Sequence, residues 1–506
     1  MCIKCLLAVL VIHSAAMVGC STPKQSATPM LDTRNPNLLV NMRLEAAEMA
    51  WDKVQSSASD RVKAREIFKS LVWSNKTPRP LRLRLADYLL NDQTPEGLAD
   101  SRTFTILRLP TEPDRSVVGM MALAAARNGW RDAAPSLVRR LAEPVRAVPD
   151  DQRVEALAIE KLYPGQSIET IVFNMFLGQS DAYSEPGRSV GFADRVHADA
   201  WTVLSRFDPN GTIRRNLVLD ASRPATGPSG RVLEDLRAGA RDLGVMPSTA
   251  MELDWLGRLH DKDNTAKQDW WQRVSSIVAK LSDEQRQGLQ LRHLEPLRIT
   301  AEADAAMLRA SRAGLYEMLA SRLENRPRNR RTAELDGSKG RFPERLEDWQ
   351  SDLVWGDLLT ILVIDDAVFT PSMADTMLQQ AGLDRADRKT EYGGVLEAVP
   401  SESARFEGVR AVLFPPRARD RVNNETFIAS RDMLEYSDRS IAHYHLHVQK
   451  VKNYKFAGPS SGDYRYADTS GRPCVVITSL SKNRLGVDYY QAGGATIDLG
   501  ELRLDD

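Results

Sequence analysis

The feature that most constrains the fold is a long run of apolar residues at helical spacing, from Leu38 to about Glu324. In one stretch of it, Ala64, Phe68 and Val72 recur on the same face of a helix. Proline and glycine residues interrupt the run at short intervals, as expected for helices joined by tight turns. The pattern predicts a helical-repeat-like region over residues 38–324, in which the helices are either HEAT-like or irregular in arrangement.

Composition limits the function of the chain. A length of 506 residues favours roughly two to four domains. Lys and Arg number 68, as do Asp and Glu, so the net charge is zero and a nucleic-acid binder is disfavoured. Hydrophobic residues at 42% and charged residues at 27% are typical of soluble globular protein, not of a protein with many membrane spans.

Residues 1–19 have the pattern of an export signal, because Lys4 supplies a positive charge and the residues after it are almost entirely apolar. The stretch ends in Met-Val-Gly followed by Cys20, which resembles the lipoprotein box of bacterial proteins. The resemblance implies that Cys20 is lipidated and that residues 20–37, rich in Ser, Thr and Pro, form a tether. Ser21 beside that cysteine implies an outer-membrane protein of the bacterial envelope that faces the periplasm. A simple secretory peptide with an incidental cysteine is the alternative.

The cysteine count is consistent with that interpretation. Cys2 and Cys5 would leave with the signal and Cys20 would carry the lipid, so Cys474 would be alone in the mature chain. An intramolecular disulfide and a cysteine-rich zinc site are therefore excluded. Cys474 lies in a strand-like apolar run, and we interpret it as a small core residue.

The helical region carries little that predicts chemistry. His197 and His293 are interpreted as ordinary helix-surface or core histidines. The pair Trp270 and Trp271 has the chemistry of a binding platform, but aromatic pairs on helices are most often packing residues. A helical array of this kind also offers a surface to a protein partner.

A change of composition ends the helical region. The basic run 326–331 is followed by Asp-Gly-Ser-Lys-Gly at 336–340. We therefore predict a solvated linker over residues 325–349 and a separate domain over residues 350–506.

The apolar period changes within this last domain. Two segments of helical pattern, 353–367 and 372–381, precede several short segments rich in β-branched and aromatic residues. The domain is thus predicted to be α+β. The expected strands are 408–415, 426–430, 440–448, 473–480, 485–490 and 495–502.

The segment 441–448 contains three of the seven histidines of the chain. As a strand, it places its apolar residues on one face and His443, His445 and His447 on the other. Imidazoles two residues apart on one face can bind a single metal ion, and neutral imidazole suits Zn²⁺. The pattern predicts a metal site that needs a third ligand from elsewhere in the chain.

Three motifs in this domain together resemble the JAMM (JAB/MPN-type) metalloprotease family: Glu-Tyr-Gly-Gly from Glu391, His-Leu-His at 445–447, and Ser-Ser-Gly-Asp from Ser460. The resemblance covers roughly residues 353–502. It implies that His445, His447 and Asp463 bind Zn²⁺. It further implies that Ser460 stabilises the oxyanion and that Glu391 is the general base that takes a proton from the attacking water.

The resemblance implies a zinc-dependent peptidase or isopeptidase-like hydrolase that acts on a protein or peptide. Two departures from the family pattern are present. Val448 stands where the family usually has proline, and the spacing from His447 to Asp463 is longer, which places an insertion within 449–457. The export signal also separates this chain from family members that act inside cells.

Other interpretations of the same residues remain open. Ser460 followed by Asp463 is a good helix N-cap without any metal, and Glu391 with its glycines is also a turn signal. Gly-Pro-Ser-Ser-Gly at 458–462 matches a nucleophile elbow, but no histidine follows His447 to complete it. The alternative function is a non-catalytic lipoprotein scaffold, whose helical array binds protein partners and whose last domain is an inactive JAMM-like fold.

Overall fold

The computed structural model describes residues 27–145, 147–178, 191–223, 225, 229–328, 332–335, 338–399 and 406–503. The predicted export signal 1–19 and the lipidation of Cys20 lie outside these residues. Two compact units divide the chain, one up to Ala124 and the other from Ala125 onward. Within the described ranges, no helix has the length and apolar character required to cross a membrane.

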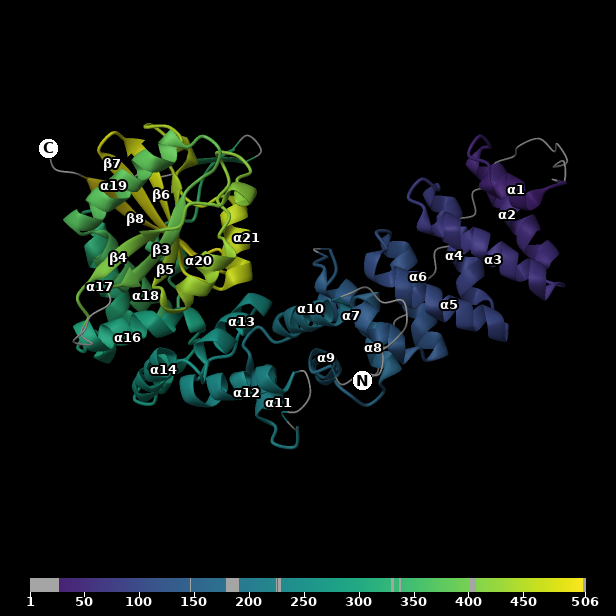
Figure 1. Ribbon diagram of the computed structural model, residues 1–506, viewed down its shortest axis with the longest axis horizontal. Coiled ribbons are helices and arrows are strands. Elements are labelled where there is room, and N and C mark those ends of the chain that lie inside the picture. Colours follow the sequence, from purple (N-terminus) through teal and green to yellow (C-terminus); the bar gives the residue numbers. More distant parts are fainter. Residues whose placement is uncertain are drawn as a thin grey trace. The chain divides into compact units, whose positions relative to one another are not determined.

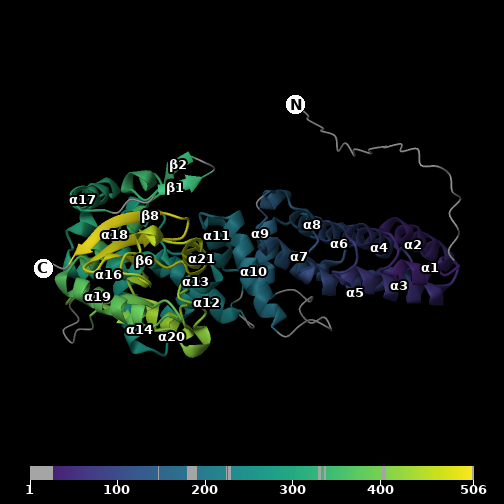
Figure 2. The same ribbon diagram turned by 90° about the horizontal axis from the view of Figure 1, so that it is seen from above.

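The first unit is built from helices that alternate between two rows. Figure 2 shows α2 and α4 in one row and α3 and α5 in the other. Helix α1 lies within the predicted tether 20–37, so part of that segment is helical. The helices are α1 (Pro29–Arg34), α2 (Val40–Val54), α3 (Ala58–Trp73), α4 (Arg79–Asn91), α5 (Pro95–Arg108) and the first part of α6 (Arg115–Asn128).

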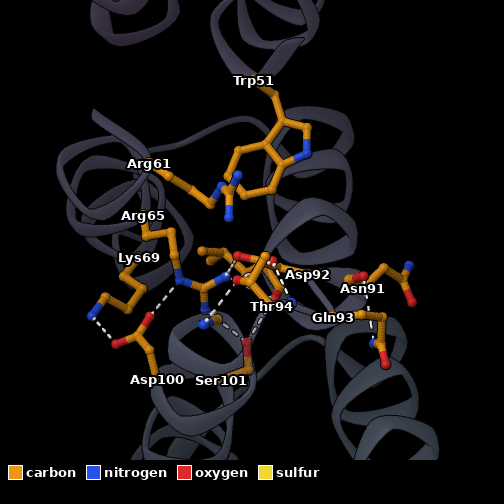
Figure 3. A network of polar contacts seen from close by, with 12 residues as sticks. Trp51, Arg61, Arg65, Lys69, Asn91, Asp92, Gln93, Thr94, Asp100 and Ser101 are labelled. Atoms are coloured by element: carbon orange, nitrogen blue, oxygen red, sulfur yellow. Dashed lines mark hydrogen bonds and ion pairs between the residues drawn. The ribbon is translucent and has the colours of Figure 1, made fainter. Parts of the chain in front are cut away.

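A buried ion-pair network joins α3 to α4 and α5, as Figure 3 shows. The side chain of Arg65 on α3 is 4% exposed and contacts Asp92 at 2.9 Å and Asp100 at 2.8 Å. It also donates to Ser101 Oγ at 2.7 Å and to the carbonyl of Leu89 in the last turn of α4. Because buried charges require compensation, these partners fix the angle at which the three helices meet.

Elsewhere in the chain, arginine side chains also donate hydrogen bonds to the carbonyl groups in the last turns of helices. The last carbonyls of a helix have no partner within the helix, and a guanidinium offers several N–H groups in a fixed geometry. Several of the arginines in the helical region thus have a structural function, which the sequence pattern did not indicate. Examples are Arg43 to the Thr33 carbonyl, Arg82 to Val72, Arg153 to Leu141 and Arg140, and Arg237 to Val218.

The second unit begins with further helices and ends with a sheet. This order confirms the predicted sequence of a helical region followed by an α+β part. The helices that precede the sheet are α7 (Ala134–Ala142), α8 (Val154–Leu162), α9 (Ile168–Phe176), α10 (Phe192–Phe207), α11 (Thr212–Leu219), α12 (Gly230–Ala238), α13 (Ala250–Leu259), α14 (Thr265–Val278), α15 (Asp283–Arg286), α16 (Leu294–Ala303) and α17 (Arg312–Glu324).

A six-stranded mixed sheet forms the C-terminal part, in the order β4-β3-β5-β6-β7-β8. Strands β5 and β6 are parallel and the other neighbours are antiparallel. The predicted strand 426–430 is absent, because that segment is a loop. The strands are β3 (Gly393–Ala398), β4 (Val409–Leu413), β5 (Ala442–His447), β6 (Cys474–Ser481), β7 (Arg484–Tyr490) and β8 (Thr496–Arg503).

Helices cover both faces of the sheet, and Figure 1 shows α19 on one side and α21 on the other. Helix α18 is apolar on nearly all sides and is buried along almost its whole length, as expected for a helix enclosed by other elements. Helix α21 lies in the connection between the parallel strands β5 and β6, which require such a crossover. The helices of this part are α18 (Trp355–Val368), α19 (Pro371–Ala386), α20 (Arg431–Tyr436) and α21 (Ser461–Ser470).

Described parts of the segment predicted as a solvated linker, 325–349, contact the sheet: the carbonyls of Pro327 and Glu344 accept from the N–H groups of Glu501 and Asp498 on β8. Strands β1 (Thr332–Leu335) and β2 (Ser338–Arg341) form an antiparallel hairpin. The guanidinium of Arg326 pairs with Asp365 of α18 and lies 3.8 Å from the ring centroid of Phe369. The division between compact units falls at Ala124, so the helices from α7 onward belong with the sheet.

Polar contacts join the helical part of this unit to the sheet. The carboxylate of Asp438 contacts Arg258 at 2.8 Å and Lys267 at 3.1 Å, and its carbonyl accepts from Trp255 Nε1 at 2.8 Å. His293 is fully buried and contacts Asp357 of α18 at 2.8 Å. His293 is therefore a core histidine, as predicted.

Trp270 and Trp271 are also packing residues, as the sequence favoured. Both side chains are buried, at 4% and 8% exposed. Their indole N–H groups donate to Glu295 at 2.6 Å and to Asp242 at 3.0 Å. The pair is thus held inside the helical part and offers no open platform.

Candidate metal centre

Strand β5 places its histidines on one face of the sheet and the residues between them on the other, as the alternation of the two in the sequence predicts. Tyr444 reaches Gln380 of α19 on one side of the sheet. On the other side, His443 contacts the hydroxyl of Tyr466 on α21 at 2.6 Å. Both faces are buried, because helices cover each of them. The three histidines therefore lie inside the protein, where an unpaired imidazole nitrogen carries a cost.

The register of β3 against β5 brings Glu391 to the histidine face. Gly393 pairs with His445, and the carbonyl of Tyr392 accepts from the N–H of Leu446 at 3.0 Å. The same antiparallel register places Glu391 opposite His447, and residues directly opposite each other share a face. Glu391 and the two histidines thus meet although they lie far apart in the sequence.

The glycines after Glu391 provide space on both faces. A Cβ on Gly393 would lie 2.5 Å from the backbone carbonyl oxygen of Tyr444 and 2.8 Å from the ring of Phe427. That ring stacks on the His445 ring with centroids 6.2 Å apart. A Cβ on Gly394 would clash with the backbone carbonyl of Val412 on β4 and would lie 2.8 Å from the hydroxyl of Tyr444. The motif Glu-Tyr-Gly-Gly thus has a packing reason here, which the turn interpretation does not supply.

Three donor atoms converge at the centre of the site. The Nε2 atoms of His445 and His447 lie 3.1 Å apart. The Asp463 carboxylate lies 3.3 Å from His445 Nε2 and 3.7 Å from His447 Nε2. Donors of a tetrahedral zinc site, with bonds of about 2.0–2.1 Å, are separated by about 3.3–3.4 Å. The chemistry and the spacing of the three groups therefore fit Zn²⁺, and each offers one ligand atom.

The outer nitrogens of the two histidines orient the rings. His447 Nδ1 lies 2.8 Å from the carbonyl of Phe456, so Nδ1 carries the hydrogen and donates it. Neutral His447 then has its lone pair on Nε2, directed toward His445 and Asp463. His445 Nδ1 lies 3.5 Å from the hydroxyl of Tyr490. Such outer partners fix the tautomer of metal-binding histidines.

The loop that follows His447, residues 449–457, contacts the site and contributes to the lining of its cavity. Gln449 donates to the carboxylate of Glu391, and Asn453 Nδ2 donates to Gln449 Oε1 at 2.7 Å and to the His447 carbonyl at 3.0 Å. Together with the Phe456 carbonyl, these groups position Glu391 and His447. The sequence predicted an insertion in 449–457 but not this function, because nothing in its composition indicates where the loop folds back.

Asp463 and Ser460 also form a helix cap. Ser460 Oγ accepts from the N–H groups of Gly462 at 3.2 Å and Asp463 at 3.3 Å, and Asp463 Oδ2 accepts from Ser460 N–H at 2.6 Å. The N-cap interpretation is therefore confirmed, and it coexists with the approach of Asp463 to the histidines. The hydrogen of the Ser460 hydroxyl is not used by the cap, because Oγ accepts both bonds.

The pKa values of the two carboxyl groups at this site, Asp463 and Glu391, shift in opposite directions. Burial raises the pKa of Asp463, but the nearby His445 and His447 and the N–H of Ser460 outweigh it, and the net pKa is lowered. Burial, together with the negative charges of Asp463 and Asp384, raises the pKa of Glu391 to about 7 against the opposing effect of His445. Asp463 is thus set as a permanent anion, whereas Glu391 exchanges a proton near neutral pH.

Asp384 of α19 is a further acid that sequence reasoning missed. It is fully buried, and its Oδ2 accepts from the N–H of Tyr392 at 2.6 Å. Burial raises the pKa of Asp384 to about 7. The contact anchors the backbone next to Glu391. A helical pattern alone places Asp384 on α19 but does not reveal which strand the helix covers.

All the residues predicted for the site line one cavity of about 460 Å³. It contains Glu391, His445, His447, Ser460 and Asp463 and extends beyond them. His443 lies at the far side and is not one of the three convergent groups. Cys474 also lines this cavity and is a buried free thiol, as predicted for a core residue.

Comparisons with known proteins add no assignment. No family model, no curated protein and no solved structure matches this chain.

Proposed function

We propose that the C-terminal part of this chain is a zinc-dependent, JAMM-like hydrolase that cuts peptide or isopeptide bonds. The observation that carries the proposal is the convergence of His445, His447 and Asp463 beside Glu391 in one cavity. Zinc held by the three ligands would polarise the carbonyl of the bond to be cut and make water a nucleophile near neutral pH. The protein would supply the proton transfer and the remaining charge stabilisation.

Glu391 is suited to act as the base. With its pKa raised to about 7, it is partly ionised at neutral pH and accepts the proton of the attacking water. It then returns this proton to the leaving amine, so that the carboxylate is regenerated. Gln449 donates to Glu391 and holds its carboxylate in place.

Ser460 is suited to stabilise the oxyanion. Its Oγ accepts two backbone N–H groups, which fix its position at the start of α21. Its own hydrogen remains for donation into the cavity, where negative charge develops on the attacked carbonyl oxygen. A fixed donor of this kind requires no rearrangement during the reaction.

We further propose that the protein acts in a bacterial envelope, attached to the outer membrane through a lipid on Cys20. The sequence pattern of residues 1–19 and the small, polar residues that follow support this location. Substrates would then be periplasmic proteins or peptides. The helical region would position the hydrolase and offer a surface to protein partners.

Metal analysis of the purified full chain tests the proposal. About one zinc per chain is expected by the ligand count of a single site. His445→Ala should abolish retention, while His197→Ala, a histidine outside the cavity, should retain it. A chain that holds no zinc under these conditions would refute the metal site.

Activity needs a separate measurement. A bacterial envelope extract treated with the zinc-loaded chain should yield new peptide termini by mass spectrometry, and Glu391→Gln should yield none of them. If Glu391→Gln retains zinc and the products are the same as for the unaltered chain, the hydrolase is refuted. A non-catalytic metal-binding scaffold would then be the remaining function.

A further inference from the structure

The helical array begins with two helices that expose apolar side chains. Leu31 on α1 is 61% exposed, and Leu39 and Met42 at the start of α2 are 68% and 46% exposed. We call these three residues the N-terminal apolar face. Figure 2 shows α1 at the end of the two rows of helices. The first repeat of a helical array ordinarily has a polar outer face, because water covers it.

The same two helices bury polar side chains. Thr33 is fully buried, and its hydroxyl donates to the Pro29 carbonyl at 2.9 Å. Arg43 is 5% exposed, and its Nε donates to the Thr33 carbonyl at 3.0 Å. Polar groups thus lie inside the unit, whereas the leucine and methionine residues near them in the sequence lie outside. This is the reverse of the arrangement that water favours, so it indicates an apolar neighbour.

The predicted lipid anchor is close to this face along the chain. The described residues begin at Ala27, seven residues after Cys20. Seven residues span at most about 25 Å when fully extended, so a lipid on Cys20 would hold the start of the array within that distance of a bilayer. Groups that are tethered so closely meet at a high effective concentration, which favours even a small area of contact.

The charges around the face do not favour a charged partner. The exposed side chains beside it include both Arg34 and Glu45, whose charges oppose each other. A nucleic acid or a strongly charged protein would require charge of one sign. Exposed leucine and methionine side chains are instead suited to enter the boundary between lipid headgroups and acyl chains.

We propose that Leu31, Leu39 and Met42 enter the bilayer that carries the anchor, so that α1 and the start of α2 lie on the membrane surface. This inference rests on the proposed lipid at Cys20 for the identity of the neighbour as a membrane. The contact would orient the first unit at the bilayer, which a lipid on a tether alone does not do.

A fluorescent probe at residue 39 tests the contact with a synthetic anchor. The chain from Ser21 onward keeps every described residue, and a histidine tag at its N-terminus binds nickel-chelating lipid in vesicles of phosphatidylethanolamine and phosphatidylglycerol. Its natural cysteine, Cys474, is buried, so Leu39→Cys supplies the thiol for an environment-sensitive probe. Leu123→Cys on α6, a position that is also 61% exposed, is the matched control.

Brominated lipid should quench the probe at residue 39 and should leave the probe at residue 123 unchanged. Adding Leu31→Ser or Met42→Ser should each lower the ratio of docked to undocked chains by roughly three- to tenfold, because half an apolar side chain then no longer enters lipid. Equal quenching at residues 39 and 123 would overturn the proposal. Loss of quenching in about 1 M salt would also overturn it, because salt screens charges and not apolar contacts.

Failure of the lipid anchor is distinguishable from failure of the apolar face. Mass spectrometry of the chain purified from bacterial membranes tests the lipid on Cys20, and its absence would refute the anchor while quenching at residue 39 still supported the face. A lipid on Cys20 without quenching at residue 39 would keep the location and overturn the face. A blue shift at residue 39 that appears without vesicles and grows with chain concentration would assign the face to a second copy of this chain and overturn the membrane contact.

Discussion

The helix cap formed by Asp463 and its proposed metal ligation can be tested separately. Asp463→Asn keeps an oxygen that can accept from the N–H of Ser460, so the cap is preserved while the charged ligand is lost. Ser460→Ala removes the acceptor for Gly462 and Asp463 but leaves the three convergent groups in place. The two substitutions should therefore act on different properties.

The size of the effect follows from binding linkage. Zinc at about 1,000 times its Kd stabilises the folded chain by about 4 kcal/mol. Changes to the outer partners of a metal ligand weaken metal binding by up to about 100-fold, and loss of a direct ligand should weaken zinc binding at least as much. At the same zinc concentration, zinc should then stabilise Asp463→Asn by only about 1.4 kcal/mol. Ser460→Ala should lose about 1 kcal/mol with and without zinc, as an N-cap does.

The assay is thermal or urea unfolding of each variant with and without zinc, followed by the far-UV signal of the sheet and helices. The zinc-induced change is taken within each variant, so differences between the metal-free proteins cancel. Equal zinc-induced stabilisation in Asp463→Asn and the unaltered chain would refute the ligand assignment. Loss of the zinc effect in Ser460→Ala instead would indicate that the cap, not the carboxylate, controls the site.

Three further predictions follow from the contacts of the chain. Gly393→Ala should destabilise the second unit by about 1–3 kcal/mol in urea unfolding, because its Cβ would lie 2.5 Å from the backbone carbonyl oxygen of Tyr444 and 2.8 Å from the ring of Phe427. Arg65→Met leaves the buried Asp92 without its cation, whereas Asp100 keeps Lys69, and should lower stability by about 3–5 kcal/mol, measured by hydrogen exchange of α3 to α5. Because the folded pKa of Glu391 is raised to about 7 from 4.5, its contribution to metal-free stability is full below about pH 4.5 and is lost as pH rises to about 7. Glu391→Gln should flatten that part of the stability profile.

The first two predictions have a control variant, and the third has a result that would contradict it. Gly382→Ala inside α19, where a Cβ meets nothing within 4 Å, should not destabilise the chain and should stabilise it by up to about 1 kcal/mol. Lys63→Met changes an exposed ion pair and should have little effect beside Arg65→Met. An identical pH profile for Glu391→Gln and the unaltered metal-free chain would show that Glu391 has an ordinary pKa when folded.

The sequence by itself determined where helices and strands form and which side chains, such as the histidines of β5, share one face. The apolar period predicted helices before sheet, and the alternation around His443, His445 and His447 assigned them to one strand face. Both follow from the geometry of a single helix or strand, in which the spacing of residues sets their direction. Glu391 and Asp463 were predicted as partners of these histidines only through the resemblance to the JAMM family.

Tertiary structure decided which of these residues meet. Asp463 reaches the histidines because α21 crosses between parallel strands, and Glu391 does so because of the register between β3 and β5. The same holds for Asp384, for the loop 449–457 and for the contacts of Arg326, Pro327 and Glu344 with the sheet domain, none of which the pattern of residues indicated. Local periodicity reports the face on which a residue lies. Contacts between distant segments depend on hydrogen-bond register and packing, which no single segment contains.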